Sequence, residues 1–550
     1  MRRYRLPPLR RCAGVPVRRV YHKDYAMNLT GEFFIGGQRR GSGEVFMGYD
    51  PAAGASIDDT GFFSATAEDI ADACAAAHAA AIAFADLPLN SRAAFLDAIA
   101  DTIEDLGDAL IARACRESGL PLARITGERG RTCGQLRLFA NEVRDGQWMK
   151  LRIDHADPAR TPPRPDLRLR MVALGPVAVF GASNFPLAFS VAGGDTASAF
   201  AAGCPVVVKG HPAHPGTSEL IAGAITAAAA ATGMPAGVFS LVNGTDNAIG
   251  AALVGDPRIQ AVGFTGSRSG GEALMKIAAA RPQPIPVYAE MSAINPVILL
   301  PAALGARGKA LAAGYIGSLT MGSGQFCTNP GLVLALDGPE LDAFLTEAGQ
   351  LVEAQTPQTM LTAGIHAAYE KGSAALAATS EVKTIARGVD PQGAHQGRTA
   401  LFSVSGRDWL ANAELQHEVF GASSIVVRCG DRAELLRVIA SLEGQLTATL
   451  QMDDADLDDA RALLPVLERR VGRILANGWP TGVEVGHAMT HGGPFPATSD
   501  GRSTSVGTLA IDRFVRPVTY QNLPADLLPA SLQEAGQSGV LSRIDGAWVI

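Results

Sequence analysis

The middle of the chain alternates short apolar runs with longer amphipathic stretches. Five of the runs, rich in Val, Ile and Phe, are typical of buried strands: Leu174–Gly181, Pro205–Lys209, Val238–Val242, Gln260–Phe264 and Ile285–Ala289. Helix-like patterns over Ala188–Ala202 and Thr217–Ala231 separate the first three of them. Strands separated by helices of this length predict βαβ units and a buried parallel sheet, so the fold class is α/β.

The flanking regions carry other patterns. Residues Glu32–Asp50 suggest a short hairpin, and Ala67–Phe84 and Ser91–Ser118 are amphipathic helices, the second capped by Asn90 or Ser91. A further helix is expected over Arg124–Glu142. Four prolines interrupt Leu151–Arg170, which is typical of a connecting or edge segment.

The α/β alternation resumes in the second half of the chain. We expect strands at Leu332–Leu336, Ser423–Val427 and Arg473–Asn477, and helices at Lys309–Leu319, Leu341–Ala354 and Leu457–Leu467. A chain of 550 residues is long enough for at least two domains with cores of their own. The pattern therefore predicts a second α/β domain.

Composition narrows the class of protein. With 47% hydrophobic and 18% charged residues and a net charge of −7, the chain fits a soluble enzyme with no general attraction to nucleic acid or to an anionic membrane. No uncharged apolar stretch is long enough to span a membrane. The seven cysteines show no metal-ligand spacing, so we expect no metal site and a reducing, cytoplasmic location.

The first 26 residues are rich in arginine and precede Met27. Prolines and the lack of an amphipathic period argue against a targeting peptide. We expect a disordered tail, or a natural start at Met27.

One cysteine stands in a setting suited to catalysis. Cys327 lies in the glycine-rich loop Gly322–Pro330, where a substrate can approach the backbone closely. Glu290 lies upstream and could activate water against a group that the thiol has captured. A lone cysteine is more often a small buried apolar residue, so its neighbours decide the interpretation.

Three loops follow strands of the first α/β region, where open parallel sheets bind ligands. Asn184 could hold an oxyanion or simply stabilise a turn. Lys209 could bind a ribose hydroxyl or a phosphate, or lie at the surface. The turn Gly266-Ser267 opens a helix and could bind an anion, or could be an ordinary helix cap.

Taken together, the motifs resemble the aldehyde dehydrogenase superfamily in order and approximate spacing. They are Asn184-Phe-Pro, Lys209, Phe264–Ser267, Glu290, Gly324–Cys327 and Glu418–Gly421, within a match from about Gly31 to Thr519. The segments Lys209–Gly216 and Ala289–Pro296 are most similar to the α-ketoglutaric semialdehyde (2,5-dioxovalerate) dehydrogenase branch. Met291–Ile294 departs from the more usual Leu-Gly-Gly-Lys after the glutamate.

The resemblance implies roles for the catalytic residues. Cys327 would attack an aldehyde, with the oxyanion held by Asn184 and the backbone N–H of Cys327. Hydride transfer to a nicotinamide would leave a thioester, which water activated by Glu290 would hydrolyse. No metal is implied.

The resemblance also implies a cofactor site. Lys209 would lie by the adenosine, Gly266 and Ser267 by the pyrophosphate, Glu418 by the nicotinamide ribose and Phe420 by the ring. Many NAD-preferring relatives carry a glutamate where this chain has Pro212. We therefore expect NADP to be preferred with NAD also accepted, and His211 to add positive charge only when protonated.

The implied architecture is a Rossmann-type cofactor domain, an α/β catalytic domain and a small oligomerisation arm. The expected boundaries are a tail at 1–26, the NAD(P)-binding domain at 27–150 and 171–290, the catalytic domain at 291–505, the arm at 151–170 and 506–525, and a C-terminal tail at 526–550. A homodimer or homotetramer would follow.

The sequence leaves one alternative function open and argues against two others. A broad-specificity or fatty aldehyde dehydrogenase would use the same residues, so the sequence does not separate it from a semialdehyde dehydrogenase. A coenzyme A-acylating enzyme would have no use for Glu290. A non-catalytic scaffold would be expected to lose Asn184, Glu290 or Cys327, and all three are present.

Overall fold

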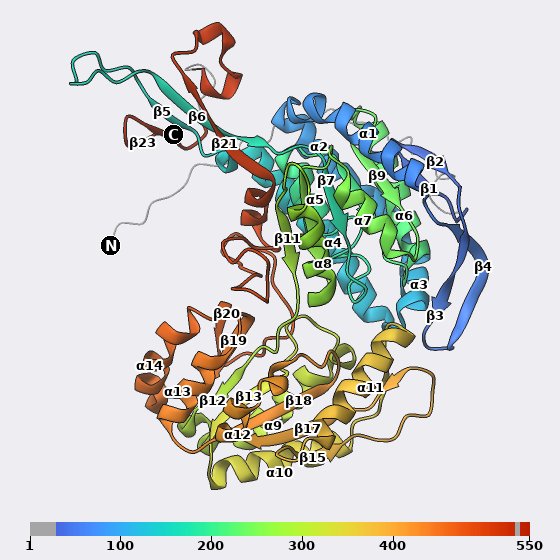
Figure 1. Cartoon of the computed structure of the whole chain (residues 1–550), viewed down its shortest axis with the longest axis vertical. Helices are drawn as coiled ribbons and strands as arrows, with labels where there is room; N and C mark the ends of the chain where they lie inside the picture. The colour runs from blue at the N-terminus through green and yellow to red at the C-terminus, as the bar shows by residue number, and fades with distance from the viewer. Residues whose placement is uncertain (1–28, 534–538, 550) are drawn as a thin grey trace, which may run out of the picture.

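The computed structural model describes residues 29–533 and 539–549 of the chain. They form two α/β bodies and a projecting arm (Figure 1). The first body is built on one seven-stranded sheet, the second on another, and the arm on a five-stranded sheet. The α/β fold class expected from the sequence is confirmed.

The sheet of the first body has the order β11-β10-β7-β8-β9-β1-β2. Its parallel strands are β7 (Val177–Phe180), β8 (Val206–Lys209), β9 (Phe239–Val242), β10 (Ala261–Thr265) and β11 (Val287–Glu290). The hairpin of β1 (Phe33–Ile35) and β2 (Gln38–Arg40) adds to it with β1 antiparallel to β9. The connecting helices are α5 (Gly194–Ala202), α6 (Pro215–Ala231), α7 (Asn247–Gly255) and α8 (Arg268–Ala279).

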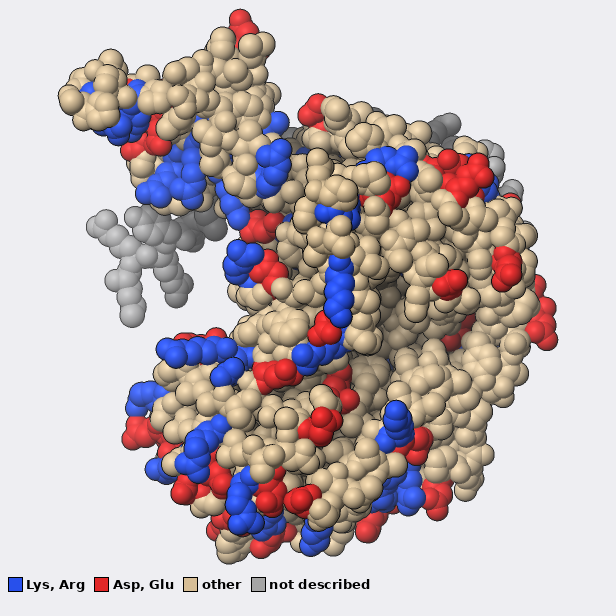
Figure 2. Space-filling view, viewed as in Figure 1, with Lys and Arg blue, Asp and Glu red and all other residues tan. Residues whose placement is uncertain are grey.

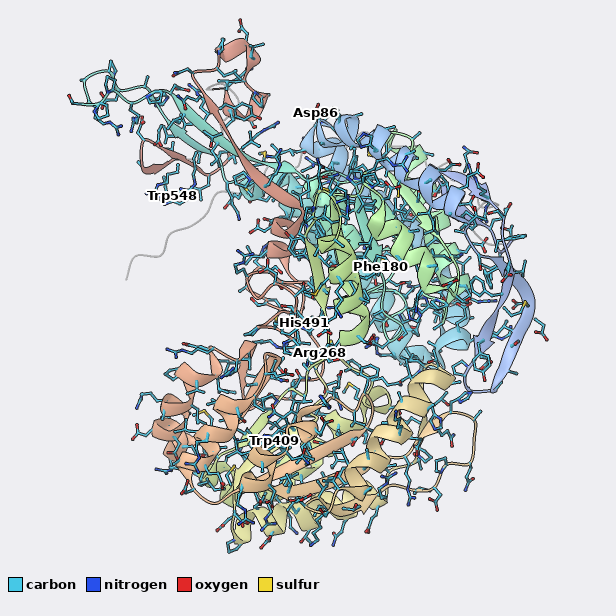
Figure 3. The ribbon with its side chains drawn as sticks, viewed as in Figure 1. Asp86, Phe180, Arg268, Trp409, His491 and Trp548 are labelled. Carbon is cyan, nitrogen blue, oxygen red and sulfur yellow. The ribbon has the colours of Figure 1, made fainter. Side chains whose placement is uncertain are left out.

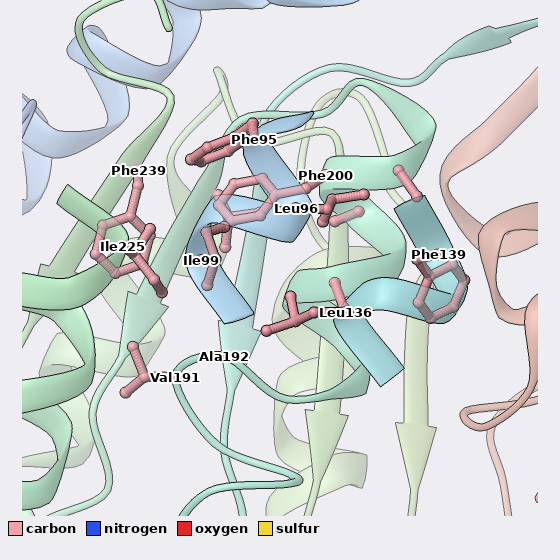
Figure 4. Close-up of a cluster of buried hydrophobic side chains, with 14 of the residues drawn as sticks. Phe95, Leu96, Ile99, Leu136, Phe139, Val191, Ala192, Phe200, Ile225 and Phe239 are labelled. Atoms are coloured by element: carbon pink, nitrogen blue, oxygen red, sulfur yellow. The ribbon is translucent and has the colours of Figure 1, made fainter. Parts of the chain in front are cut away.

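Four further helices complete this body: α1 (Ala67–Ala85), α2 (Leu89–Asp105), α3 (Gly107–Ser118) and α4 (Leu122–Asp145). Figure 4 shows side chains of α2, α4, α5 and α6 meeting in one apolar core. Phe95 and Phe200 lie with ring centroids 5.1 Å apart at its centre. Burial of such aromatic pairs fixes the helices against the sheet whose strand ends carry the candidate residues.

Several local expectations were wrong in detail. The expected helix Ser91–Ser118 is two helices, because Gly107 has φ +57°, a left-handed conformation that interrupts the helical path. Its N-cap is Pro88, so Asn90 lies inside the helix. Val45 is not part of the first hairpin, since β3 (Val45–Asp50) pairs with β4 (Ala55–Phe63).

The sheet of the second body has the order β15-β17-β18-β13-β12-β19-β20. Its strands are β12 (Val297–Leu299), β13 (Leu332–Leu336), β15 (Lys383–Arg387), β17 (Ala400–Ser405), β18 (Ser423–Cys429), β19 (Gln445–Gln451) and β20 (Val471–Ala476). Helices cover it: α9 (Pro301–Thr320), α10 (Pro339–Glu353), α11 (Ala363–Ala378), α12 (Gly406–Ala411), α13 (Arg432–Ser441) and α14 (Leu457–Leu467). Two short strands, β14 (Gln358–Thr359) and β16 (Gln396–Gly397), pair separately.

The arm is a sheet of order β21-β6-β5-β22-β23. It contains β5 (Arg152–Asp154), β6 (Leu167–Ala173), β21 (Val515–Gln521), β22 (Ser542–Ile544) and β23 (Ala547–Val549). Strands β6 and β21 pair antiparallel from Leu167↔Gln521 to Ala173↔Val515. Figure 2 shows Lys and Arg side chains gathered on the visible face of the arm, and Arg152 and Arg516 are exposed residues of its strands.

Part of the C-terminal tail joins the arm. Strand β22 pairs with β5, and Leu532 is fully buried in the large core of the first body. Trp548, by contrast, is 63% exposed on the arm (Figure 3). Among the described residues, no helix has the length and apolar character needed to cross a membrane.

Candidate active site

The loops that follow the parallel strands of the first body leave from one edge of its sheet. The register pairs Phe180 with Lys209 and Thr265 with Glu290, so these strand ends lie side by side. Asn184, Lys209, Ser267 and Glu290 therefore reach the same side of the sheet, which faces the second body. This is the edge at which open α/β sheets bind ligands.

The second body supplies the cysteine loop. Helix α9 ends at Thr320, and a tight turn over Met321–Gly324 leads to Cys327. Gly324 has φ +69°, and a Cβ there would lie 2.3 Å from the carbonyl carbon of Gly421. Only glycine permits this approach, which presses the cysteine loop against the segment Glu418–Gly421. The side chain of Asn295 also donates to the carbonyl oxygen of Cys327 at 2.8 Å.

Cys327 lies in a cluster with a histidine and a glutamate. Its Sγ is 3.3 Å from Nε2 of His491, and the same nitrogen is 2.8 Å from Oε1 of Glu290. The hydroxyl of Ser505 donates to Oε2 of Glu290 at 2.7 Å. His491 is buried where the two bodies meet (Figure 3), and its Nδ1 has no hydrogen-bond partner among the described residues.

The electrostatics of the cluster oppose a resting thiolate. Burial raises the pKa of Cys327 well above its usual value, and the neighbouring charge of Glu290 raises it further. Burial also acts to raise the pKa of Glu290, but His491 and the Ser505 hydroxyl outweigh it, so this pKa is lowered. At neutral pH the thiol therefore stands protonated beside an ionised carboxylate.

The ligand atoms of Glu290, Cys327 and His491 all lie within 4.8 Å of one another, and these residue types can also ligate a metal ion. In this structure their contacts are to one another. The arrangement holds the thiol of Cys327 beside a proton acceptor.

Asn184 lies beside the cysteine loop. Its side-chain amide donates to the carbonyl oxygen of Gln325 at 3.0 Å. The next residue, Phe185, packs edge-on against Phe326 with ring centroids 5.3 Å apart. One of the two amide hydrogens of Asn184 is not needed for the Gln325 contact, and it could serve an oxyanion on a carbon bound to Cys327.

Lys209 ends β8 in a secluded position. Its ammonium donates to the carbonyl oxygen of Gly244 at 2.8 Å, and burial lowers its pKa to about 8. His211 stacks on His214 at 5.4 Å, and burial lowers the pKa of His211 well below its usual value. His211 is therefore neutral at pH 7 and adds no positive charge beside Pro212.

Gly266 and Ser267 form the turn into α8. The Ser267 hydroxyl caps the helix by accepting from the backbone N–H of Gly270 at 3.2 Å. The N–H of Gly266 donates to the carbonyl oxygen of Glu290 at 3.1 Å. The helix N-terminus thus lies directly beside the strand that carries Glu290.

Glu418 and Phe420 line a pocket behind the cysteine loop, together with Gly324 and Asn329. Burial raises the pKa of Glu418 to about 7, against hydrogen bonds from Ser292 and the backbone of Ala293 that lower it. Near neutral pH this carboxyl group is therefore present in both protonation states.

These groups fit a dinucleotide cofactor. Lys209 and the N-terminus of α8 offer positive charge and N–H donors, which suit phosphate and ribose oxygens. Glu418 offers an acceptor for ribose hydroxyls from the opposite body, and Phe420 offers an apolar ring near the cysteine loop. The first body thus offers positive charge and N–H donors for the phosphates, and the second body offers an acidic acceptor for ribose hydroxyls.

Two residues of the cluster were missed from the sequence. His491 lies in Gly486–Pro496, a loop rich in Gly and Pro, and Ser505 follows it. A histidine in a glycine-rich loop was the available signal, but nothing in one sequence indicates that it folds against Cys327. The backbone of Ser505 donates to the carbonyl oxygen of His491 at 2.9 Å, which holds the two together.

The chain is similar to known proteins in sequence and in fold. Residues 39–503 match the model of the aldehyde dehydrogenase family. The chain is 60% identical over 522 residues to "Alpha-ketoglutaric semialdehyde dehydrogenase 2" of Azospirillum brasilense, covering 94% of this chain and 99% of that protein. It is 48% identical over 521 residues to "Alpha-ketoglutaric semialdehyde dehydrogenase" of Acinetobacter baylyi, covering 94% and 98%.

The fold is similar to that of a solved NADP-dependent glyceraldehyde-3-phosphate dehydrogenase from Bacillus halodurans in complex with NADP. The TM-score is 0.77 at 22% identity, and the match covers 90% of this chain and 99% of that one. Matched over most of its length by the family model and by relatives of nearly equal length, this chain belongs to the aldehyde dehydrogenase family.

Proposed function

We propose that the protein oxidises α-ketoglutaric semialdehyde to 2-oxoglutarate with NADP+, and that it also accepts NAD+. Oxidation of an aldehyde follows from the family, and the two semialdehyde dehydrogenases at 60% and 48% identity support the substrate. The observation that carries the chemistry is the contact of Cys327 Sγ with His491 at 3.3 Å, and of His491 with Glu290 at 2.8 Å.

The first step uses the thiol. Because its surroundings raise the pKa of Cys327, the thiol needs a proton acceptor, and we assign this role to the pair of His491 and Glu290. As the proton leaves, sulfur bonds to the aldehyde carbon and the carbonyl electron pair moves to oxygen. The resulting oxyanion is held by the Asn184 amide and the backbone N–H of Cys327.

NAD(P)+, when bound, accepts the hydride that the collapse of this thiohemiacetal releases, leaving a thioester on Cys327. Lys209 and the N-terminus of α8 would hold the adenosine and pyrophosphate end. Glu418 and Phe420 would hold the nicotinamide end next to the cysteine loop.

Deacylation uses Glu290 as a base. Its lowered pKa keeps the carboxylate ionised at pH 7, ready to take a proton from water as the water oxygen bonds to the thioester carbon. The carbon–sulfur bond then breaks and Cys327 recovers its proton. Overall, one aldehyde, one water and one NAD(P)+ yield one carboxylate, one NAD(P)H and two protons.

The residues expected to lie by the adenosine of the cofactor support a preference for NADP. Pro212 stands where a carboxylate would repel a 2′-phosphate, and Lys209 is charged below pH 8. His211 contributes no charge, so Lys209 carries the preference. Acceptance of NAD follows because a single cation at this end can attract a 2′-phosphate without excluding the cofactor that lacks one.

The competing function is a general or fatty aldehyde dehydrogenase of the same mechanism. Initial rates with α-ketoglutaric semialdehyde, succinic semialdehyde and hexanal, each with NADP+ and NAD+, separate the two. We expect the highest kcat/KM for α-ketoglutaric semialdehyde. A kcat/KM no better than that for hexanal would sink the substrate assignment, and activity that survives Cys327→Ala would sink the mechanism.

We further propose a homodimer or homotetramer assembled through the arm, in the cytoplasm. The arm projects from the body as a sheet with exposed side chains on β21 and β23 (Figure 1), which supports contact with a second copy. The six cysteines among the described residues are all free thiols, which supports a reducing compartment.

A further inference from the structure

An apolar cluster lies beside the reacting cysteine. It contains Phe185, Phe189 and Phe326, joined by the partly buried Val483, Val485 and Met489. Phe326 directly precedes Cys327, and Phe189 lies 6.2 Å from His491 between ring centroids. Such a wall suits the carbon chain of an aldehyde and has nothing in it to recognise a carboxylate.

Two arginines of α4 reach into this cluster. The guanidinium of Arg124 lies over the ring of Phe185 at 4.3 Å, and that of Arg131 lies over the ring of Phe189 at 4.9 Å. Seven residues separate them, so they share one face of the helix. Arg124 is neutralised by Glu128, with Nη1 and Oε2 2.6 Å apart.

Arg131 has no such partner. Across residues 29–533 and 539–549, no carboxylate lies within ion-pair distance of its guanidinium, and its Nη1 is buried without a hydrogen bond. Its Nη2 reaches the carbonyl oxygen of Val483 at only 3.4 Å. An unpaired buried guanidinium costs stability unless an anion arrives to match it.

A series of side-chain contacts connects Arg131 to the reacting cysteine. Arg131 packs on Phe189, Phe189 lies against His491, and His491 touches Cys327. Against the larger effects of burial and of Glu290, the charge of Arg131 lowers the pKa of Cys327. The guanidinium of Arg131 therefore lies in the apolar cluster beside Cys327, close enough for the two groups to interact electrostatically.

We propose that Arg131 is the receptor for the substrate carboxylate, binding it through its free Nη1 and so selecting short aldehydes that carry an acid group. This inference rests on the proposed function, because it deepens the substrate assignment of the same site. Guanidinium–carboxylate hydrogen bonds are charge-assisted and directional, which makes arginine the suitable residue type.

Arg473 of β20 is the competing cation, since it lies close enough to Cys327 for the charge of that residue to act on the pKa of Arg473. Its Nη2, however, donates to the carbonyl oxygens of Pro480 and Gly482 at 2.9 and 3.1 Å. Those bonds hold the segment that leads to Val483. Arg473 therefore positions a loop through Nη2, although its Nε is also buried without a hydrogen bond among the described residues. Arg131 is the stronger candidate because its guanidinium lies over Phe189 in the apolar cluster beside Cys327.

The test compares a substrate that carries the 2-oxo acid end with an aldehyde of the same chain length that lacks it. We would measure kcat/KM of wild type, Arg131→Met, Arg131→Lys, Arg473→Met and the control Arg129→Met with 2,5-dioxopentanoate and with pentanal. Methionine keeps the packing over Phe189 without charge. We expect Arg131→Met to lose about 10- to 100-fold with the acid and less than about threefold with pentanal, with partial recovery in Arg131→Lys. Arg129→Met, in the same helix, should match wild type.

A second readout does not depend on turnover. Binding of 2-oxoglutarate to Arg131→Met, measured by calorimetry, should weaken by a similar factor, while its thermal unfolding matches that of Arg129→Met. If Arg131→Met does not fold, Arg131→Lys decides, because an unchanged ratio of acid to pentanal activity in it contradicts the proposal.

Each contrary result has a distinct meaning. Equal losses with both aldehydes in Arg131→Met would make Arg131 a packing residue. Loss of the acid preference in Arg473→Met but not in Arg131→Met would move the receptor to Arg473, and overturn the inference while the proposed function stands. A wild type that does not prefer the acid over pentanal would instead overturn the proposed substrate.

Discussion

At the scale of single residues, the reactivity of Cys327 is controlled by what surrounds it. Burial and the charge of Glu290 hold the thiol protonated, so an acceptor must be within reach when substrate arrives. The three groups involved come from a strand end, a turn and a distant loop. Separate substitutions therefore affect separate steps of one reaction.

Glu290→Gln tests the deacylation step. Removal of the carboxylate leaves no base for water, so steady turnover should fall by about 10²- to 10⁴-fold. The first equivalent of NADPH should still form as a burst in stopped-flow absorbance, because hydride leaves before water attacks. The burst should be slower than in wild type, because Glu290 also belongs to the pair that accepts the thiol proton. A variant without any burst would contradict this role, and Ser505→Ala, which removes one hydrogen bond to Glu290, should show only a mild loss.

His491→Asn tests the acylation step. The imidazole contacts both the thiol and the carboxylate through Nε2, so its loss should slow the burst itself by about 10- to 100-fold. Single-turnover kinetics with saturating cofactor measure this rate directly. A variant with a normal burst but slow steady turnover would show that His491 acts in deacylation and not in acylation.

The choice of cofactor should depend on pH through Lys209. Burial lowers its pKa to about 8, so the ammonium is charged below that pH and loses its proton above it. The KM for NADP+ should therefore rise as pH passes from 7 to 9, while the KM for NAD+ changes less. Lys209→Met should flatten this dependence. A ratio of the two KM values that is constant with pH would exclude Lys209 as the phosphate contact.

The sequence identified these residues to different degrees, for a physical reason. Cys327, Glu290 and Asn184 stand at strand ends or in small-residue turns, where local pattern marks a ligand-facing position. His491 is equally close to the chemistry, yet its loop lies 164 residues beyond Cys327 in the chain. Contacts that form only when the chain folds cannot be detected in a local sequence pattern, so the position of His491 beside Cys327 could be found only from the structure.

At the scale of elements, the turns depend on glycine where the backbone leaves the usual conformations. Gly107 separates α2 from α3, and an amphipathic pattern that runs across it conceals the break. By contrast, β13 and α14 were expected at Leu332–Leu336 and Leu457–Leu467, and the structure has the same bounds. A regular hydrophobic period predicts helices and strands well, but it does not reveal a single left-handed residue that separates two helices.

Gly324→Ala tests the turn that holds the cysteine. The new Cβ would lie 2.3 Å from the carbonyl carbon of Gly421 at φ +69°, so the cysteine loop must move away from the Glu418–Gly421 segment. We expect a loss of activity of at least about 10-fold and a lower melting temperature. Gly317→Ala is the matched control, because this position in α9 has open space and no positive φ. It should stabilise the protein by about 0.5–1 kcal/mol in denaturant unfolding.

At the scale of the whole molecule, the proposed active site belongs to neither body alone. The first body contributes Asn184 and Glu290, the second contributes Cys327, and His491 lies in the segment that returns from the second body to the first. Arg268 bridges the same junction through an ion pair with Glu443 at 2.9 Å (Figure 3). The relative placement of the two bodies is therefore itself a requirement for the chemistry.

The arm offers the last test, because it projects beyond both bodies. The loop 155–166 joins β5 to β6 at its far end (Figure 1), and His155 and Arg164 of this loop are ion-paired to Asp545. Replacing 155–166 with Asn-Gly should keep the β5–β6 hairpin, since Asp154 faces Leu167 in the antiparallel register. If the arm assembles the oligomer, this shortening removes the part that extends farthest.

With a chain mass of 57.1 kDa, light scattering after size exclusion should give the wild type a mass of about two or four chains, and the shortened variant a smaller mass. Asp545→Ala is the control, because it releases the loop from β22 without shortening the arm and should keep the wild-type mass. A single-chain mass for the wild type would remove the proposed assembly. An unchanged mass in the shortened variant would show that the subunits meet through another surface. Strand β21 is then the next candidate, because its outer edge is unpaired in the described sheet.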